Sequence, residues 1–377
     1  ALDAWKRSTC FDESHITHGM RARCHAALPW LSANPPSPPT PAPPPEPAAA
    51  LVSAAIEGVV APSFLVGCKV TLGSLSAAGQ WLMPTGASRA LATVQTSARG
   101  RYAFSASALR ALRIQGMRWG SQIVALQAPR GSSCKTVDGR AFRGMLLTSP
   151  GAKVMSPLTS IGTLLMQEPS IGGKRAALRL LTRALRLDNA TQLMDVDPTY
   201  GALEGSPGAR AAVLASYKVL ALLQQTAAVL TVAKAAAAKG VTAETAYLVA
   251  YAALADAVQA RAALSSTAEL PKGTRRGLQT AAVAVNFLED PAVLQAVVQS
   301  AAVRAQVTVD TTIIAMAANV TVAIVQAYDA AATMGSTAAD QGDTSSQWLQ
   351  NVVKISVIDD SLAEQSMAIA EGVANGT

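Results

Sequence analysis

The stretch Val154-Met-Ser-Pro-Leu-Thr-Ser-Ile-Gly-Thr-Leu-Leu165 marks the point where the pattern of this 377-residue chain changes. Before it, residues 51–154 carry short runs of alternating apolar and polar side chains, separated by glycine and serine, which is the pattern of β-strands. After it, apolar side chains recur at the three- and four-residue spacing of amphipathic helices. The sequence therefore predicts an α+β protein of several domains, with the strands first and the helices after them.

Six runs within residues 51–154 are expected to form strands. They are Ala55–Val60, Phe64–Leu72, Leu91–Thr96, Gly100–Ser105, Ile123–Leu126 and Phe142–Leu147. Their lengths and spacings are typical of a small β-sandwich of the immunoglobulin-like or prealbumin-like kind. The insert Ser107–Gly120 is predicted to hold a short helical turn.

The rest of the chain is expected to be an alanine-rich antiparallel helical bundle. The predicted helices are Lys174–Leu187, Pro207–Lys239, Thr242–Ser266, Pro271–Asn286, Pro291–Val307, Thr311–Met334 and Thr344–Asn375. Glycine and proline mark the breaks between them, and the connections are short. Because aromatic residues make up only 4% of the chain, the interior must be built from small side chains in close contact.

The first 50 residues differ in composition from both of these parts. Residues 1–33 form a small cysteine-bearing head, which is too short to bury a core without a bridge or a neighbour. Residues 34–50 are rich in proline, which fixes φ and lacks the N–H group that helices and sheets need. We expect Asn34–Pro47 to form an extended polyproline II segment of roughly 40 Å at about 3.1 Å per residue, so that residues 34–50 are a linker. The predicted domains are thus the head 1–33, the linker 34–50, a β-sandwich 51–154 and a helical bundle 155–377.

The four cysteines fall into two local pairs, Cys10 with Cys24 and Cys68 with Cys134. An even number of cysteines in such pairs fits disulfides formed in an oxidising compartment. The second bridge would tie the two ends of the β-domain by closing a loop of about 65 residues, worth about 3 to 4 kcal/mol in the chain-entropy model. Two buried free thiols are the alternative.

A zinc site is the other interpretation of the N-terminal cysteines. Thiolate and imidazole groups are the ligands that zinc prefers, and Cys10, His15, His18, Cys24 and His25 include every histidine of the chain. Structural zinc sites usually pair ligands two to four residues apart, and this spacing matches no such pair. No metal site is therefore predicted in the head.

Calcium is considered at Asp188, Asp195 and Asp197, because hard cations prefer carboxylate oxygens. The spacing of these residues is not that of an EF-hand loop. Asp197-Pro198 also has the pattern of a helix start, in which the aspartate caps N–H groups and proline takes the first helical position. The cap is the favoured interpretation, which leaves Asp195 and Asp197 as secondary candidates for a metal.

No catalytic residue and no cofactor are predicted. General acid–base catalysis most often uses histidine or paired carboxylates, and the histidines all lie in the small head. The sequence contains no Gly-X-Ser-X-Gly elbow, no Walker loop and no His-Glu-X-X-His motif. An enzyme is therefore not expected.

The charge pattern gives expectations about partners. The net charge is +7, but the basic residues are scattered and do not form a patch interleaved with aromatics, so nucleic acid is not expected. The segment Asp340–Glu371 is acidic, with six acidic residues against Lys354. A basic front and an acidic end favour head-to-tail association of copies, and a solvated helix face is the alternative.

No membrane-spanning helix is predicted. The most apolar stretch, Thr311–Ala327, is interrupted by Asn319, Thr321 and Gln326. It also falls short of the roughly 20 apolar residues that a span needs.

Three Asn-X-Thr sequons and the proline run are the candidate glycosylation sites. Asn189 and Asn375 lie in polar, loop-like surroundings, whereas Asn319 lies in an apolar helical stretch and is expected to be unmodified or on a solvent face. The candidates in the proline run are Pro35, Pro36, Pro38, Pro39, Pro41, Pro43, Pro44, Pro45 and Pro47, together with Ser37 and Thr40.

Two family resemblances follow from these motifs. Thr96-Ser-Ala-Arg-Gly-Arg-Tyr-Ala-Phe104 resembles the signature of carboxypeptidase-regulatory-like or prealbumin-like sandwich modules of cell-surface proteins. The stretches Val154–Leu165 and Leu185–Pro198 resemble the junction of large bacterial and algal surface proteins, where such a sandwich passes into a helical domain. The acidic residue usual in the turn between Thr96 and Gly100 is missing here, so this resemblance does not imply calcium binding.

The proline run with Ser37 and Thr40 resembles the hydroxyproline-rich glycoproteins of volvocine green algae, which include pherophorins and filament proteins. In that family such prolines are hydroxylated and arabinosylated. The chain departs from a pherophorin, whose flanking domains are richer in cysteine.

These resemblances imply a structural extracellular glycoprotein of a cell wall, matrix or flagellar surface filament. Its partners would be copies of itself or other matrix or filament glycoproteins, and it would carry covalent glycans. A secreted adhesion module that binds carbohydrate or peptide is the main alternative, and an intracellular scaffold with reduced cysteines is a third.

Overall fold

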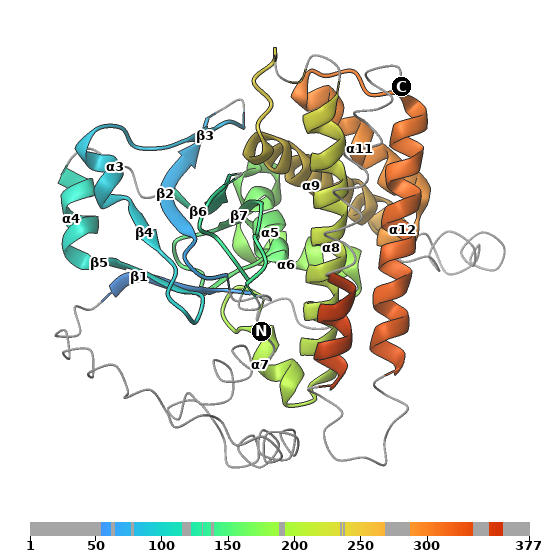
Figure 1. Ribbon diagram of the computed structural model, residues 1–377, viewed down its shortest axis with the longest axis horizontal. Helices are drawn as coiled ribbons and strands as arrows, with labels where there is room; N and C mark the ends of the chain where they lie inside the picture. The colour runs from blue at the N-terminus through green and yellow to red at the C-terminus, as the bar shows by residue number, and fades with distance from the viewer. Residues whose placement is uncertain are drawn as a thin grey trace.

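The computed structural model describes residues 54–356, apart from 62–64, 77–78, 115–121, 130, 137–138, 188–192, 234–235, 237, 268–286 and 335–346. A β layer occupies one side of the molecule and a group of helices the other (Figure 1). The α+β class predicted from the sequence is therefore confirmed. The predicted head 1–33 and linker 34–50 lie outside the described residues.

The β layer consists of two sheets with two short helices at its outer edge (Figure 1). The strands are β1 (Ala54–Val60), β2 (Lys69–Leu75), β3 (Trp81–Leu82), β4 (Thr93–Gln95), β5 (Arg101–Ser105), β6 (Gln122–Ala128), β7 (Gly144–Thr148) and β8 (Val154–Met155), and the helices are α3 (Ala87–Leu91) and α4 (Ala106–Ile114). One sheet has the order β5-β1-β8; the other has the order β3-β2-β6-β7, with β4 also paired to β2. Among the described strands, β1 and β8 pair in parallel and the other pairs are antiparallel.

The predicted strand Phe64–Leu72 begins later than expected, since β2 starts at Lys69. Gly67 has a φ of +66°, a left-handed conformation that interrupts an extended strand. β3 and β8 were not predicted, because two residues carry no detectable alternation. The helical turn expected within Ser107–Gly120 corresponds to α4.

Helices make up the second part of the structure. They are α5 (Pro157–Gln167), α6 (Lys174–Leu185), α7 (Pro198–Leu203), α8 (Pro207–Val232), α9 (Ala243–Thr267), α11 (Pro291–Ala305) and α12 (Thr311–Met334), with the 3₁₀ turns η3 (Pro169–Ile171) and η4 (Phe287–Glu289) and a last helix over 347–356. The predicted helix Pro271–Asn286 lies outside the described residues, and 347–356 is the described part of the predicted helix Thr344–Asn375.

Proline sets the start of several of these helices. Asp197, Ser206 and Asp290 each accept a backbone N–H at the N-cap of a helix, and a proline follows each of them. Proline suits the first helical position, because its fixed φ fits the helix and its missing N–H would have no partner there. The sequence analysis predicted the cap at Asp197 and began two of these helices at Pro207 and Pro291.

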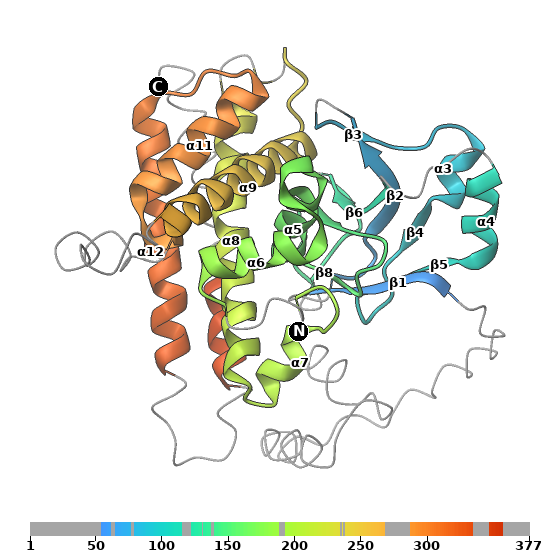
Figure 2. The same ribbon diagram turned by 180° about the vertical axis from the view of Figure 1, so that it is seen from behind.

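The strands and the helices share a hydrophobic core. One cluster of buried side chains runs from Ile56 in β1 through β6 and β7 to Val325 in α12. At the contact, the ring of Tyr247 in α9 covers Gly144 in β7, where an added Cβ would lie 2.7 Å from the Tyr247 Cζ atom. Figure 2 shows α5 between the β layer and the longer helices. The predicted boundary between residues 154 and 155 thus runs through continuous packing, and an immunoglobulin-like sandwich remains a prediction.

Two described helices, α8 and α12, are long and apolar enough to cross a membrane by length and composition alone. In α8, 83% of the apolar window is buried inside the structure, as expected for the core helix of a bundle. In α12 the buried share is 39%, and the exposed positions include Asn319 and Gln326.

Candidate functional site

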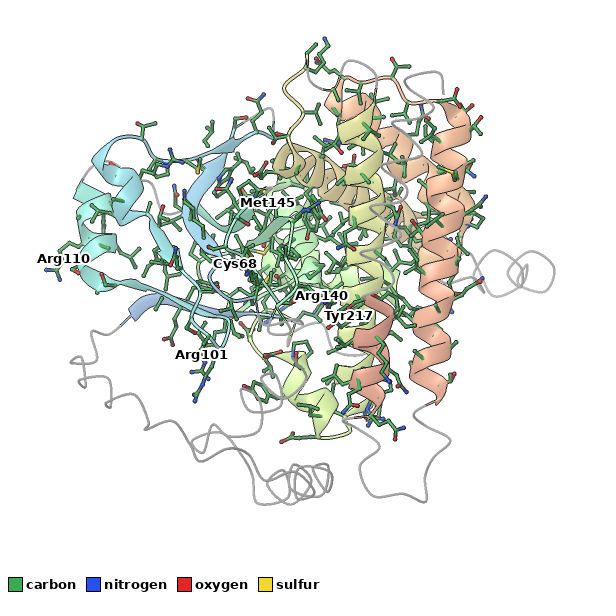
Figure 3. All side chains as sticks on the ribbon, in the orientation of Figure 1. Cys68, Arg101, Arg110, Arg140, Met145 and Tyr217 are labelled. Atoms are coloured by element: carbon green, nitrogen blue, oxygen red, sulfur yellow. A yellow bond between two sulfur atoms is a disulfide. The ribbon has the colours of Figure 1, made fainter. Side chains whose placement is uncertain are left out.

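The disulfide between Cys68 and Cys134 joins the start of β2 to the turn that follows β6. This is the bridge predicted from the sequence, and both residues are buried. Figure 3 labels Cys68 within the β layer. The Thr96 hydroxyl accepts the Cys68 N–H at 2.9 Å, and the Ser133 hydroxyl donates to the Gly67 carbonyl at 2.8 Å. The polypeptide on each side of the bridge is therefore fixed by hydrogen bonds as well. The other predicted pair, Cys10 and Cys24, lies outside the described residues.

The Gly-X-Tyr-X-Phe motif of the sandwich resemblance lies in β5. Its residues Tyr102 and Phe104 are buried and meet edge to face, with ring centroids 6.3 Å apart. Tyr102 also covers Gly58 of the neighbouring strand β1, where an added Cβ would lie 2.5 Å from the tyrosine oxygen. Burial raises the pKa of Tyr102, because it disfavours the phenolate. Both aromatic residues of the motif thus act as core residues.

The junction quoted at the start of the sequence analysis forms the N-terminus of α5. Ser156 and Thr159 make a capping box: the Ser156 hydroxyl accepts the Thr159 N–H at 3.2 Å, and the Thr159 hydroxyl accepts the Ser156 N–H at 2.7 Å. The Ser160 hydroxyl accepts the N–H of Leu147 in β7 at 2.7 Å. The Ser-Pro-Leu-Thr-Ser motif therefore caps the helix and also binds it to the sheet.

The two aspartates considered for a metal are held by other interactions. Asp195 forms an exposed ion pair with Lys174 at 3.1 Å. Asp197 caps α7 through its Oδ1 atom, which accepts the Thr199 N–H at 2.9 Å, so the predicted cap is confirmed. Asp188 lies outside the described residues, and within the described ones no three His, Cys, Asp or Glu side chains converge to hold a metal.

Asp197 is almost fully buried, and its Oδ2 atom has no hydrogen-bond partner in the structure. Burial raises the pKa of Asp197 above its ordinary value, because it disfavours the charged carboxylate. The hydrogen bond from the Thr199 N–H and the positive charge of Arg101 lower this pKa by less than burial raises it.

The sequence analysis missed a charged cluster between α8 and α12. The Lys218 Nζ atom lies 2.5 Å from Asp329 Oδ1 and 3.8 Å from Glu289 Oε1. The lysine side chain is only 5% exposed, whereas those of Asp329 and Glu289 are 40% and 33% exposed. The ammonium group is thus buried and neutralised by two carboxylates that still reach solvent.

A signal for this cluster was present in the sequence. Lys218 is the only charged residue of α8 after Arg210, and Asp329 is the only charged residue of α12. Each directly follows a tyrosine, and the rings of Tyr217 and Tyr328 stack with centroids 5.7 Å apart. Two lone opposite charges in apolar helices favour a pair, because a buried charge needs a partner. The contact fixes the register of α8 against α12.

The last described helix, 347–356, is held at both of its ends. Near its start, the Arg210 guanidinium lies over the ring of the buried Trp348, 5.3 Å from the ring centroid. At its end, Arg140 donates to the Ser356 hydroxyl at 3.2 Å. Four aromatic side chains of the helical part are buried: Tyr217, Tyr247, Tyr251 and Trp348.

Asn319 is the candidate glycosylation site within the described residues. It lies on the exposed side of α12, whereas Thr321 of the same sequon is buried and donates its hydroxyl to Ala317 O. The side chain of Asn319 thus faces solvent. The other candidates lie outside the described residues: Asn189, Asn375, the nine prolines of the linker, Ser37 and Thr40.

Comparisons of the chain with protein-family models, with curated proteins and with solved structures find no match.

Proposed function

We propose that this protein is a structural extracellular glycoprotein whose copies assemble in a cell wall, a matrix or a flagellar surface filament. The observation that carries the proposal is the buried Cys68–Cys134 disulfide, because such bonds persist in oxidising compartments and are rare in reducing ones. The proline run 34–50 and the exposed sequon at Asn319 support it, since both suit a glycosylated protein.

We also propose that the β layer is a distant form of the prealbumin-like sandwich. Three features support this proposal. The β layer has two sheets, alternate residues of β5 are buried, and a disulfide lies at the start of β2. An experimental structure of the full chain would test the proposal, because the two sheets of a sandwich face each other about 10 Å apart. Sheets that share no face would contradict it.

The glycoprotein proposal is tested on the native protein. Proteolysis followed by mass spectrometry of the peptide that contains Pro35–Pro47 is expected to find hydroxyproline that carries pentose. The same chain produced in bacteria provides the unmodified reference peptide. A native peptide with the mass of the bacterial one would reject the proposal.

The compartment is tested separately. Thiol labelling of the native protein in denaturant without a reductant is expected to leave Cys68 and Cys134 unlabelled. The denaturant is needed because both residues are buried and would escape the label in the folded protein even as free thiols. Full labelling of these residues would favour an intracellular scaffold.

A further inference from the structure

Helix α6 carries a row of arginines on its outer side. Arg175, Arg179 and Arg183 are all exposed, while the opposite side of the helix, which includes Leu178 and Leu181, is buried. Steps of four residues place them on one face over about 12 Å. We call these three residues the α6 arginine stripe.

The stripe is not neutralised by its surroundings. Helix α6 contains no acidic residue, and the neighbouring Asp195 pairs with Lys174. Within the described part of the chain, Arg175, Arg179 and Arg183 form no ion pair. Guanidinium groups bind carboxylates with two parallel hydrogen bonds, so a row of them suits a partner that carries carboxylates at matching intervals.

The sequence contains such a partner. After Lys354 the chain has no further basic residue, and Asp359, Asp360, Glu364 and Glu371 follow. Asp360 and Glu364 are four residues apart, as Arg175 and Arg179 are. Glu371 follows seven residues later. In a helix, as the sequence predicts for this segment, these three carboxylates share one face. We call residues 357–377 the acidic segment.

The last described helix, 347–356, which precedes the acidic segment in the sequence, lies on the far side of α8 from α6. In Figure 1 the helix 347–356 lies in front of α8, and in Figure 2 it lies behind α8 while α6 lies in front. The buried clusters agree, because Trp348 and Val352 contact one side of α8 through Tyr217, whereas α6 residues belong to the main core. To reach α6 of its own molecule, the acidic segment would have to pass around the helices. A contact with α6 of another molecule does not require this path.

We propose that the acidic segment of one copy binds the α6 arginine stripe of a second copy. This inference rests on the proposed assembly role and names the contact that would carry it. Because the two surfaces differ, the contact is head-to-tail, and such contacts build open chains unless the rotation closes a ring. The association is salt-sensitive, since the charges are exposed.

Charge reversal on the full-length chain tests this contact. The stripe variant is R175E/R179E/R183E and the segment variant is D360K/E364K/E371K. Analytical ultracentrifugation at low salt is expected to show that either set weakens self-association at least tenfold, because each ion pair is replaced by a repulsion. The control R89E/R110E/R113E reverses three exposed arginines of α3 and α4 and is expected to associate like the wild type.

Mixing the two variants is the decisive measurement. The acidic α6 of the stripe variant then meets the basic segment of the other variant, and the two remaining surfaces keep their native charges, so association is expected to return. A chain that carries both sets of changes is likewise expected to associate with itself.

A mixture that stays dissociated would overturn the inference, and so would a wild type that is monomeric at all concentrations or that loses association equally in the control. A polyanion bound by the stripe of a monomeric wild type would assign the surface to another partner and overturn it too. None of these results bears on the glycan measurement, which tests the proposed function independently.

Discussion

Asp197 combines two properties that oppose each other in a folded protein. Its carboxylate caps α7 and so stabilises the helix, but the same carboxylate is buried and one of its oxygens lacks a partner. The raised pKa means that the folded protein holds the proton to a higher pH than the unfolded chain does. The free energy of unfolding therefore falls as the pH rises above about 4, the ordinary pKa of aspartate, through the raised value.

Asp197→Asn is expected to make the protein more stable at pH 7. The amide oxygen still accepts the Thr199 N–H, and no charge is buried. Urea unfolding followed by circular dichroism should show a gain at pH 7 that shrinks as the pH is lowered toward the ordinary aspartate value.

Asp290→Asn is the matched control, because Asp290 also caps a helix ahead of a proline but makes an exposed hydrogen bond. It is expected to bring no such pH-dependent gain. A loss of stability at pH 7 in Asp197→Asn would contradict the prediction and indicate that the buried charge is favourable.

At the scale of elements, the start of α5 links the helical part of the chain to the sheet. The Thr159 hydroxyl accepts the Ser156 N–H in a fully buried setting, and Thr163, one turn later, donates only to the carbonyl of Thr159. The Thr159 hydroxyl is therefore the partner of a buried N–H group, whereas the Thr163 hydroxyl only adds a hydrogen bond to a carbonyl of the same helix.

Thr159→Val is expected to lower the free energy of unfolding by about 2 kcal/mol, because it leaves a buried N–H without a partner. Thr163→Val is expected to cost less than about 1 kcal/mol, since the carbonyl it releases still accepts the helical N–H. Chemical denaturation of both variants measures the difference. Equal losses would show that the capping box contributes nothing beyond the burial of the side chains.

The long elements were predictable from the sequence and the short ones were not. The predicted helix Thr311–Met334 has the bounds that α12 shows, because an amphipathic pattern repeated over many turns leaves little choice. β3 and β8 have two residues each, which is too short for a sequence pattern. β3 forms by pairing with the preceding strand β2, and β8 by pairing with the distant strand β1. The pairing of Cys68 with Cys134 was predictable. For the Lys218 cluster the sequence shows two lone opposite charges in apolar helices, but the distance between them depends on the packing of α8 against α12.

On the scale of the whole molecule, the shared core determines how the protein unfolds. Buried side chains connect β1, β7, α5 and α9 without a break, and Tyr247 covers Gly144 at the contact. Unfolding of the strands would therefore expose apolar side chains of the helices to water, and unfolding of the helices would expose those of the strands.

Calorimetry is expected to show a single unfolding transition for strands and helices. Gly144→Ala should shift this whole transition, by about 2 kcal/mol or more, because φ is +136° and the added Cβ meets the Tyr247 ring. Gly172→Ala is the control: φ is +59° but nothing lies near the added Cβ, so the cost is about 1 kcal/mol. Two separate transitions, of which Gly144→Ala moves only one, would show independent domains.

The Cys68–Cys134 bridge also decides how the chain responds to tension. The covalent loop has a sequence separation of 66 and contains β2 to β6, while β1, β7 and β8 lie outside it. A force pulling on the two ends of the polypeptide passes through the sulfur atoms and bypasses the loop. At about 3.4 Å per extended residue, the bridge withholds about 220 Å of chain length from stretching. Reduction would release this length, so the redox state of this bond changes how far the chain can extend.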